Sequence, residues 1–139
     1  MKILIYVENT ILNEAMAPIG DAVKKATAWM ESGAEISYLT EKTKFLEVKN
    51  VKDKLKELAF PGEIVRSRQG DETFKAVIDS VAPNVFVQHG LESELVKFNE
   101  DKKINIVSVA NGGIDNLPDK LDDLAAFGKK ETLEPEVKE

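Results

Sequence analysis

Apolar residues occur in short runs that alternate with longer segments of helical periodicity. Lys2–Val7 is a nearly continuous apolar run, which is typical of a strand covered on both faces. Comparable runs follow at residues 34–40, 63–68, 84–89 and 104–109, of which the run at 63–68 is more polar than the others. We therefore predict five strands.

Between these runs, apolar residues recur at the three- and four-residue spacing of amphipathic helices. The first predicted helix has Asp21 as its N-cap and ends at Gly33. The second ends before Pro61 and Gly62, and the third follows Asp71 as its N-cap. The residues expected to face the core are Ala22, Val23, Ala26, Trp29 and Met30 in the first helix, Val48, Val51, Leu55 and Leu58 in the second, and Phe74, Val77, Ile78 and Val81 in the third.

The carboxyl-terminal part of the chain is less regular. Residues 91–101 are predicted to form a weak helix, and residues 110–127 a turn followed by a short helix. In that turn, Gly112 and Gly113 permit positive φ angles. The remaining tail, residues 129–139, is charged and is expected to fray.

The alternation of strands and helices predicts one α/β domain over residues 1–128, with three layers and a mostly parallel sheet of five strands. Helices are expected on both faces of the sheet. The segment between the first strand and Asp21 is too short for a large inserted cap domain.

Composition narrows the classes of function. The chain has 139 residues, of which 42% are hydrophobic and 32% are charged, as in a folded globular domain. The net charge of −6, with basic and acidic residues interleaved, argues against nucleic-acid binding. No apolar run approaches the roughly 20 residues of a membrane span, and no signal segment is recognisable, so we expect a cytoplasmic protein without a membrane partner. Because there is no cysteine, disulfides and thiolate metal sites are excluded.

Polar residues follow the predicted strands at the ends where parallel α/β sheets bind ligands. We expect these strand ends to converge in one crevice. The candidate residues are Tyr6, Glu8, Asn9 and Thr10 after the first strand, Thr40 after the second, Arg66 and Arg68 after the third, and Gln88 and His89 after the fourth.

Four short segments resemble the haloacid dehalogenase (HAD) superfamily. "IYVENTIL" resembles its motif one, a strand followed by Asp-x-Asp-x-Thr, and "ISYLT" resembles motif two, a strand ending in Thr or Ser. "APNVFVQHGLES" resembles motif four, and "IVSVANGGIDNLPD" is similar to the closing segment of a small HAD subfamily. The resemblance implies a HAD-like, Rossmann-type fold without a large cap.

The same resemblance implies a role for each matching position. Tyr6 stands where the family has its nucleophilic aspartate, and Glu8 stands at the acid/base position. Thr10 is then the motif-one threonine, and Thr40 is the hydroxyl of motif two. Because tyrosine is bulky and mostly protonated near neutral pH, Tyr6 does not replace a carboxylate that attacks phosphorus and binds magnesium.

The acidic metal ligands of motif four fall on Gln88, His89 and Gly90. Glutamine is a neutral oxygen ligand, and histidine prefers softer transition metals to Mg²⁺. Since the nucleophile and the metal ligands of the family are missing together, we expect no metal and no cofactor. The cation of motif three is not identified by spacing; the candidates are Arg66, Arg68 and Lys75.

Each of these residues also has a purely structural interpretation. Tyr6 can be a core aromatic residue at a strand end, and Thr40 can be a helix N-cap. Glu8 can be a solvated loop residue, and His89, as the sole histidine, makes no metal site by itself. The arginine pair can serve to keep an edge strand soluble.

Three functions remain. The leading interpretation is a catalytically degenerate HAD-like protein that acts as a non-catalytic binding or interaction module. The first alternative is a residual HAD-type hydrolase or phosphatase that uses Glu8 with an atypical nucleophile. The second is an unrelated α/β binding protein of flavodoxin-like topology. The partners expected are a small anionic ligand, a protein or a second copy of the chain.

Overall fold

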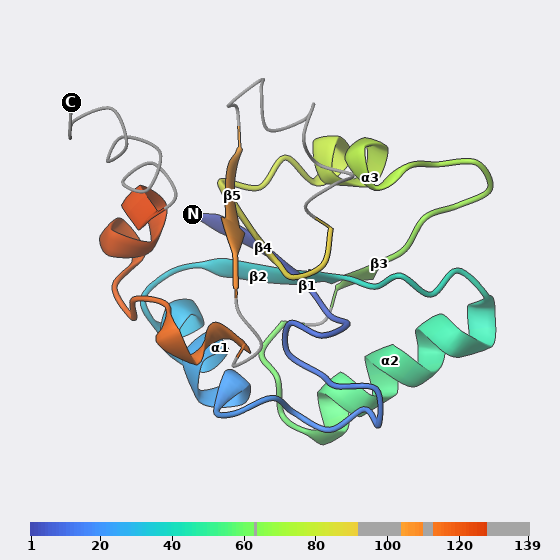
Figure 1. Ribbon diagram of the computed structural model, residues 1–139, viewed down its shortest axis with the longest axis horizontal. Coiled ribbons are helices and arrows are strands. Elements are labelled where there is room, and N and C mark those ends of the chain that lie inside the picture. The colour runs from blue at the N-terminus through green and yellow to red at the C-terminus, as the bar shows by residue number, and fades with distance from the viewer. Residues whose placement is uncertain (63, 92–103, 110–112, 128–139) are drawn as a thin grey trace.

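The computed structural model describes residues 1–62, 64–91, 104–109 and 113–127. Five strands form one sheet in which every neighbouring pair is parallel, in the order β3-β2-β1-β4-β5 (Figure 1). The predicted α/β class with a five-stranded, mostly parallel sheet is confirmed. The strands are β1 (Lys2–Tyr6), β2 (Glu35–Leu39), β3 (Val65–Arg66), β4 (Val85–Gln88) and β5 (Asn105–Ser108).

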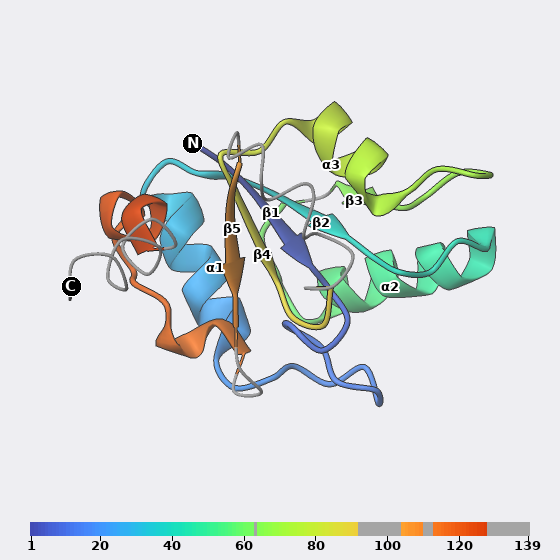
Figure 2. The ribbon, with the colours of Figure 1, turned by 45° about the horizontal axis from the view of Figure 1, so that its top comes forward.

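Helices cover both faces of the sheet and complete three layers (Figures 1 and 2). The helices α1 (Ala22–Glu31) and α2 (Phe45–Glu57) lie on one face, and α3 (Phe74–Val81) lies on the other. The 3₁₀ turn η1 (Gly113–Asn116) and the helical residues 121–127 pack on the α1 side. Residues 7–21, which connect β1 to α1, contain no inserted cap, as predicted.

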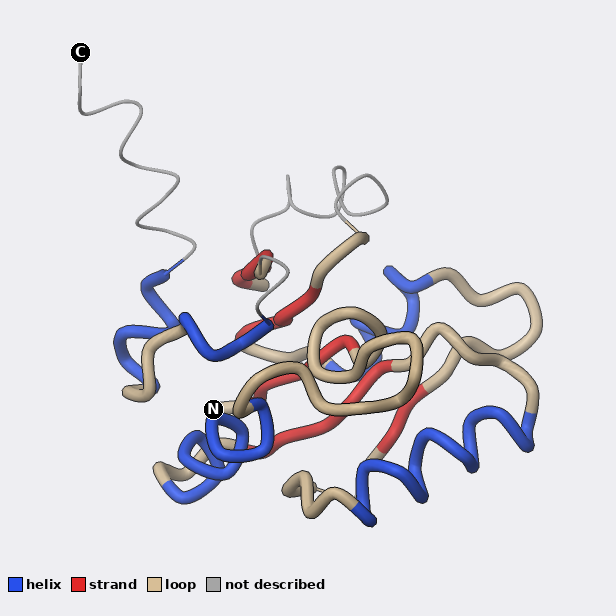
Figure 3. The backbone as a smooth tube through the Cα atoms, turned by 60° about the horizontal axis from the view of Figure 1, so that its bottom comes forward, coloured by secondary structure: helices blue, strands red, loops and turns tan. Residues whose placement is uncertain are grey.

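The alternation of side chains along β1 assigns its residues to two separate cores. Ile3, Ile5 and Val7 pack with residues of α1 and α2, whereas Leu4 and Tyr6 pack with residues of α3. All five side chains are buried. The sequence of β1 is continuously apolar because this strand lies between two helical layers. Figure 3 shows the strands and helices from another side.

The strand order reverses at β1. From β1 the chain builds β2 and β3 on one side, and it then crosses to the other side to form β4 and β5. This is the Rossmann-type order 3-2-1-4-5-6 without its sixth strand, and it differs from the flavodoxin order 2-1-3-4-5. Loops that follow β1 and β4 therefore diverge, and ligands of such sheets bind beyond the carboxyl ends of these strands.

Some local predictions are wrong. Met30 was expected in the core but is 43% exposed, because it follows the fully buried Trp29 by one residue and so lies roughly 100° around the helix. The N-cap of α3 is Thr73, whose hydroxyl accepts the N–H of Ala76, and not Asp71. Asp21 is the N-cap of α1 without a capping bond from its own side chain.

Other predictions fall outside the described part of the chain. These are most of the weak helix at 91–101, Gly112 and the tail at 129–139. Gly113 has the expected positive φ, at 80°. No described helix is long and apolar enough to cross a membrane. The cytoplasmic location stays a prediction.

Candidate functional site

Glu8 lies just beyond β1, and its carboxylate joins the loops that follow β1 and β2. Its Oε2 accepts the Thr40 hydroxyl at 2.5 Å, and its Oε1 accepts the backbone N–H of Glu41 at 2.9 Å. Thr40 is fully buried, and its oxygen also accepts the N–H of Lys42 at 3.2 Å. The structure therefore brings two of the candidate residues, Glu8 and Thr40, into direct contact and holds the carboxylate in one position.

The turn after β1 is equally well defined. The carbonyl oxygen of Val7 accepts the N–H groups of Thr10, Ile11 and Leu12 at 3.1–3.3 Å. Asn9 has a φ of 63°, a left-handed conformation that asparagine tolerates better than most residues. Asn9 is exposed, whereas Thr10 is fully buried and donates its hydroxyl to the Glu8 carbonyl at 3.5 Å.

A second group of side chains gathers at the carboxyl ends of β1, β2 and β3; we call Tyr6, Glu41, Arg68 and Phe74 the Arg68 cluster. The guanidinium carbon of Arg68 lies 4.2 Å from the centroid of the Phe74 ring. The Tyr6 ring meets Phe74 edge-on at 5.8 Å, and the Tyr6 hydroxyl donates to Glu41 at 3.4 Å. Arg66, the other candidate arginine, is exposed on β3 and lies outside this cluster.

Gln88 and His89 are held on the opposite side of β1, against β5. Gln88 is fully buried; its Nε2 donates to the Ser108 hydroxyl at 2.6 Å, and its Oε1 accepts the N–H of Leu91 at 2.9 Å. The Nδ1 of His89 is 2.6 Å from the carbonyl oxygen of Val109. Because a carbonyl can only accept, Nδ1 carries the proton, and Nε2 is an acceptor in the neutral ring.

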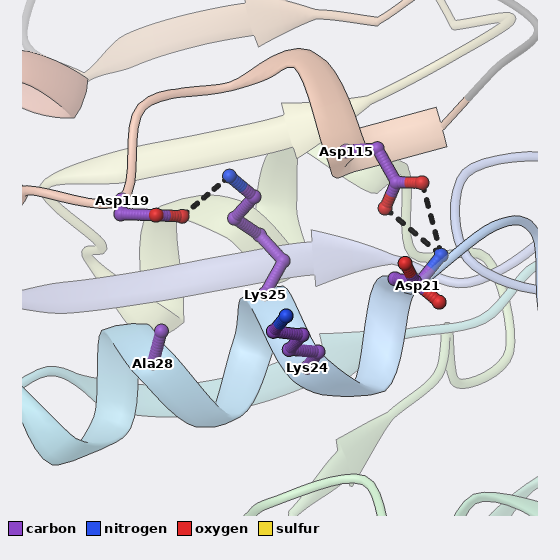
Figure 4. Close-up of a pocket in the computed structure, with 6 residues that line it drawn as sticks. All are labelled: Asp21, Lys24, Lys25, Ala28, Asp115 and Asp119. Carbon is purple, nitrogen blue, oxygen red and sulfur yellow. Dashed lines mark hydrogen bonds and ion pairs between the residues drawn. The ribbon is translucent and has the colours of Figure 1, made fainter.

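A pocket of about 260 Å³ lies elsewhere, beside α1 (Figure 4). Sequence reasoning missed it, because its two walls are about 90 residues apart in the chain and share no recognisable motif. Its lining residues are Asp21, Lys24, Lys25, Ala28, Asp115 and Asp119.

Most polar groups of this pocket are used to hold the segment 113–119 against α1; we call these contacts the α1 clamp. Both carboxylate oxygens of Asp115 accept the backbone N–H of Asp21, at 3.0 and 2.9 Å. The Lys25 ammonium donates to the Leu117 carbonyl at 2.5 Å. It also donates to Asp119 at 2.5 Å (Figure 4). The hydrogen bond from Lys25 lowers the pKa of Asp119.

Two further features complete the α1 clamp. The indole N–H of Trp29 donates to the Pro118 carbonyl at 2.9 Å. Gly20 has a φ of 57°, and a Cβ at that position would lie only 2.2 Å from a carboxylate oxygen of Asp115. Residue 20 is therefore a glycine for both conformational and steric reasons. Since its groups satisfy one another, we interpret this pocket as a packing seam.

Comparison with known proteins gives a structural similarity but no sequence match. No family model matches the sequence, and no curated protein matches it. A solved structure of similar fold is a universal stress protein in complex with cAMP, at 10% sequence identity and a TM-score of 0.44. The match covers 79% of this chain and 96% of that chain. At such low values the similarity says nothing about a ligand of this protein.

These findings overturn the resemblance to the HAD superfamily. The structural neighbour is a universal stress protein and not a HAD protein, and no family model supports the four motif matches. The physical reason is that short apolar strands followed by polar turns occur in any parallel α/β sheet.

The positions of the residues agree with this correction. Tyr6 is a core residue on the α3 side. Gln88 hydrogen-bonds to Ser108 and Leu91, and His89 to Val109, whereas Glu8 hydrogen-bonds to the loop after β2. Among the described residues, no three His, Cys, Asp or Glu side chains are grouped so as to hold a metal ion. Because the first two interpretations depend on the resemblance to HAD proteins, the α/β binding protein is the interpretation that remains.

Proposed function

We propose that this protein is a module that binds a small ligand beyond the carboxyl ends of β1 and β4. The observation that supports the proposal is the strand order, which reverses at β1, because parallel α/β sheets bind ligands where their strand order reverses. Polar side chains held by hydrogen bonds flank this position, with Glu8 and Thr40 on one side and His89 on the other.

The preorganised loops support this proposal. A ligand that meets groups already held in place does not have to order them, which reduces the entropic cost of binding. Glu8 has both carboxylate oxygens in hydrogen bonds, and the ring of His89 is oriented by the Val109 carbonyl. Each still offers an acceptor: further lone pairs on the Glu8 carboxylate, and Nε2 of the neutral His89 ring.

The ligand is expected to bind differently from a dinucleotide. In dinucleotide-binding sheets, the pyrophosphate lies at the N-terminus of the helix that follows the first strand. In this protein, the carboxylate of Asp115 already accepts the N–H of Asp21 at the start of α1. The chain's own anion occupies the position that a phosphate would take.

The test is an NMR-detected screen of the ¹⁵N-labelled protein against nucleotides, sugar phosphates, amino acids and small carboxylic acids. Binding at the proposed place shifts the backbone amides of Glu8, Asn9 and His89 and leaves those of Lys24 and Ala28 unchanged. The proposal is wrong if ligands shift only the amides that line the pocket beside α1, or if no member of these classes binds.

A pair of variants sharpens the screen. Thr40→Val removes the hydroxyl that orients Glu8, so it should lower the affinity for a ligand by about tenfold if binding depends on that orientation. Thr43→Val makes the same chemical change at an exposed position in the same loop and should leave the affinity unchanged.

A further inference from the structure

Arg68 combines partial burial with unused hydrogen-bond donors. Its side chain is half-buried and stacks on Phe74. Its Nε is buried and has no hydrogen-bond partner among the described residues. Its Nη2 has one contact, with the Glu41 carbonyl at 3.5 Å, which is at the upper limit of a hydrogen bond. Of the five N–H donors of a guanidinium, the described structure shows this one weak bond.

The charge of Arg68 also has no direct counterion in the part of the chain that the structure describes. No described carboxylate forms an ion pair with Arg68. Glu41 is the nearest acid in the cluster, but its carboxylate accepts the Tyr6 hydroxyl and lies 3.6 Å from the Lys42 ammonium. Stacking on an aromatic ring stabilises a guanidinium face but satisfies none of its N–H groups.

A buried donor without a partner is unfavourable, and native proteins contain few of them. An arginine is retained in such a place when its planar fork has a partner of matching geometry, and carboxylate and phosphate groups match it best. Since the described chain supplies no such group, the partner is expected to come from outside.

We propose that Arg68 binds an oxyanion, the carboxylate or phosphate group of a small ligand, at the carboxyl ends of β1, β2 and β3. This inference rests on the proposed function and gives the ligand its chemical class. An oxygen of the ligand replaces the weak contact of Nη2 with the Glu41 carbonyl and so releases that carbonyl. Binding therefore also moves the backbone after β2.

The direct test uses the wild-type protein and its arginine side-chain signals. We would titrate ¹⁵N-labelled protein with sodium phosphate and, separately, with sodium acetate, and replace sodium chloride to keep the ionic strength constant. The expected result is a saturable shift of the Arg68 Nε–Hε signal and of the Lys42 amide, with the Arg66 Nε–Hε signal unchanged. Comparing the two titrations shows whether phosphate or carboxylate is preferred.

Variants test the geometry of the fork. Arg68→Lys keeps the charge but loses the planar fork, so it should weaken phosphate or acetate binding by about tenfold. Arg66→Lys is the matched control and should change the affinity by less than about twofold, because Arg66 is exposed and outside the cluster. Glu41→Gln removes a neighbouring negative charge and should tighten binding by about twofold or more.

The inference is overturned if the Arg68 signal does not respond, or if Arg68 and Arg66 respond equally and without saturation. The results distinguish failure of this inference from failure of the proposed function. A ligand from the screen that shifts Glu8 and His89 but not the Arg68 signal supports the function and refutes this inference. Saturable phosphate binding at Arg68 supports the inference even if the screen finds no ligand near His89.

Discussion

The α1 clamp and the Arg68 cluster are both made of charged and aromatic side chains, but they use their hydrogen bonds differently. In the α1 clamp, Lys25 has two acceptors, Asp115 accepts with both oxygens, and the Trp29 N–H has a carbonyl partner. In the Arg68 cluster, the described residues give the guanidinium one weak contact and leave its buried Nε without a partner.

This difference separates a place that stabilises the fold from a place suited to binding. Polar groups that already hydrogen-bond to one another gain little free energy from a ligand, because the ligand would first have to break these hydrogen bonds. A charged group with unused donors gains directly from a ligand that supplies oxygens. The pocket beside α1 is therefore less promising as a ligand site than the strand ends, although its volume is about 260 Å³.

The largest effect is expected where the α1 clamp meets the core. Trp29→Ala should lower the free energy of unfolding by about 3–5 kcal/mol, because it creates a cavity and leaves the Pro118 carbonyl without its donor. Urea denaturation measures the loss. Met30→Ala, at the adjacent exposed position, should cost no more than about 0.5 kcal/mol. Equal losses for the two variants would contradict the buried role of Trp29.

A smaller loss is expected from opening the N-terminus of α1. Asp115→Ala removes both acceptors of the Asp21 N–H and should lower the free energy of unfolding by about 1–2 kcal/mol. Asp123→Ala removes the same charge from an exposed position and is the control. If both variants lose equal stability in urea, the effect is one of net charge, and Asp115 is not a cap.

In the Arg68 cluster, by contrast with the α1 clamp, removal of the charged side chain should cost little stability. Arg68→Met loses a cation–π contact worth about 0.5–1 kcal/mol but also removes an unpaired buried donor, so stability should change by less than about 1 kcal/mol. Lys25→Met, the corresponding change in the α1 clamp, should cost more, because it removes two hydrogen bonds of a side chain that is 12% exposed. A reversed order in thermal or urea denaturation would overturn the contrast.

The smallest expected effect is on the loss of folding stability at acid pH. The hydrogen bond from Lys25 lowers the pKa of Asp119 below 3.8, its ordinary value. A carboxyl whose pKa is lower in the folded state stabilises the fold above its unfolded pKa, and this contribution is lost as the pH falls through the folded pKa. Asp119→Asn should therefore reduce the loss of stability seen below about pH 4. Identical acid-unfolding curves for the two proteins would show that the pair contributes nothing.

Much of the architecture follows from local patterns in the sequence. The apolar run at Lys2–Val7 and the helical spacing of Ala22, Ala26 and Trp29 predict elements that the structure contains. Such periodicity reflects which faces of a strand or helix are covered, so it can be recognised without knowing the partner element. The parallel sheet and the absence of a large cap follow from the order and length of these segments.

The same reasoning predicts a candidate site at the strand ends, but it does not predict the contacts between the residues of that site. That polar residues follow the strands is visible in the sequence; that Thr40 orients Glu8, and that Arg68 rather than Arg66 stacks on Phe74, is not. The sequence motifs even suggested a wrong family, because Tyr6 could be read as a catalytic position until its packing against α3 was known.

What the sequence determined by itself is the set of elements and the faces that they bury. Which polar groups meet cannot be inferred from local sequence, since it depends on strand order, on register and on contacts between distant segments. Asp21 and Asp115 are 94 positions apart, as are Lys25 and Asp119, and no local pattern relates them. The pairing of Leu39 with Arg66, and of Gln88 with Ser108, likewise determines which side chains face each other at the strand ends. These contacts are non-local. They determine which hydrogen-bond donors are used within the fold and which are left for a ligand.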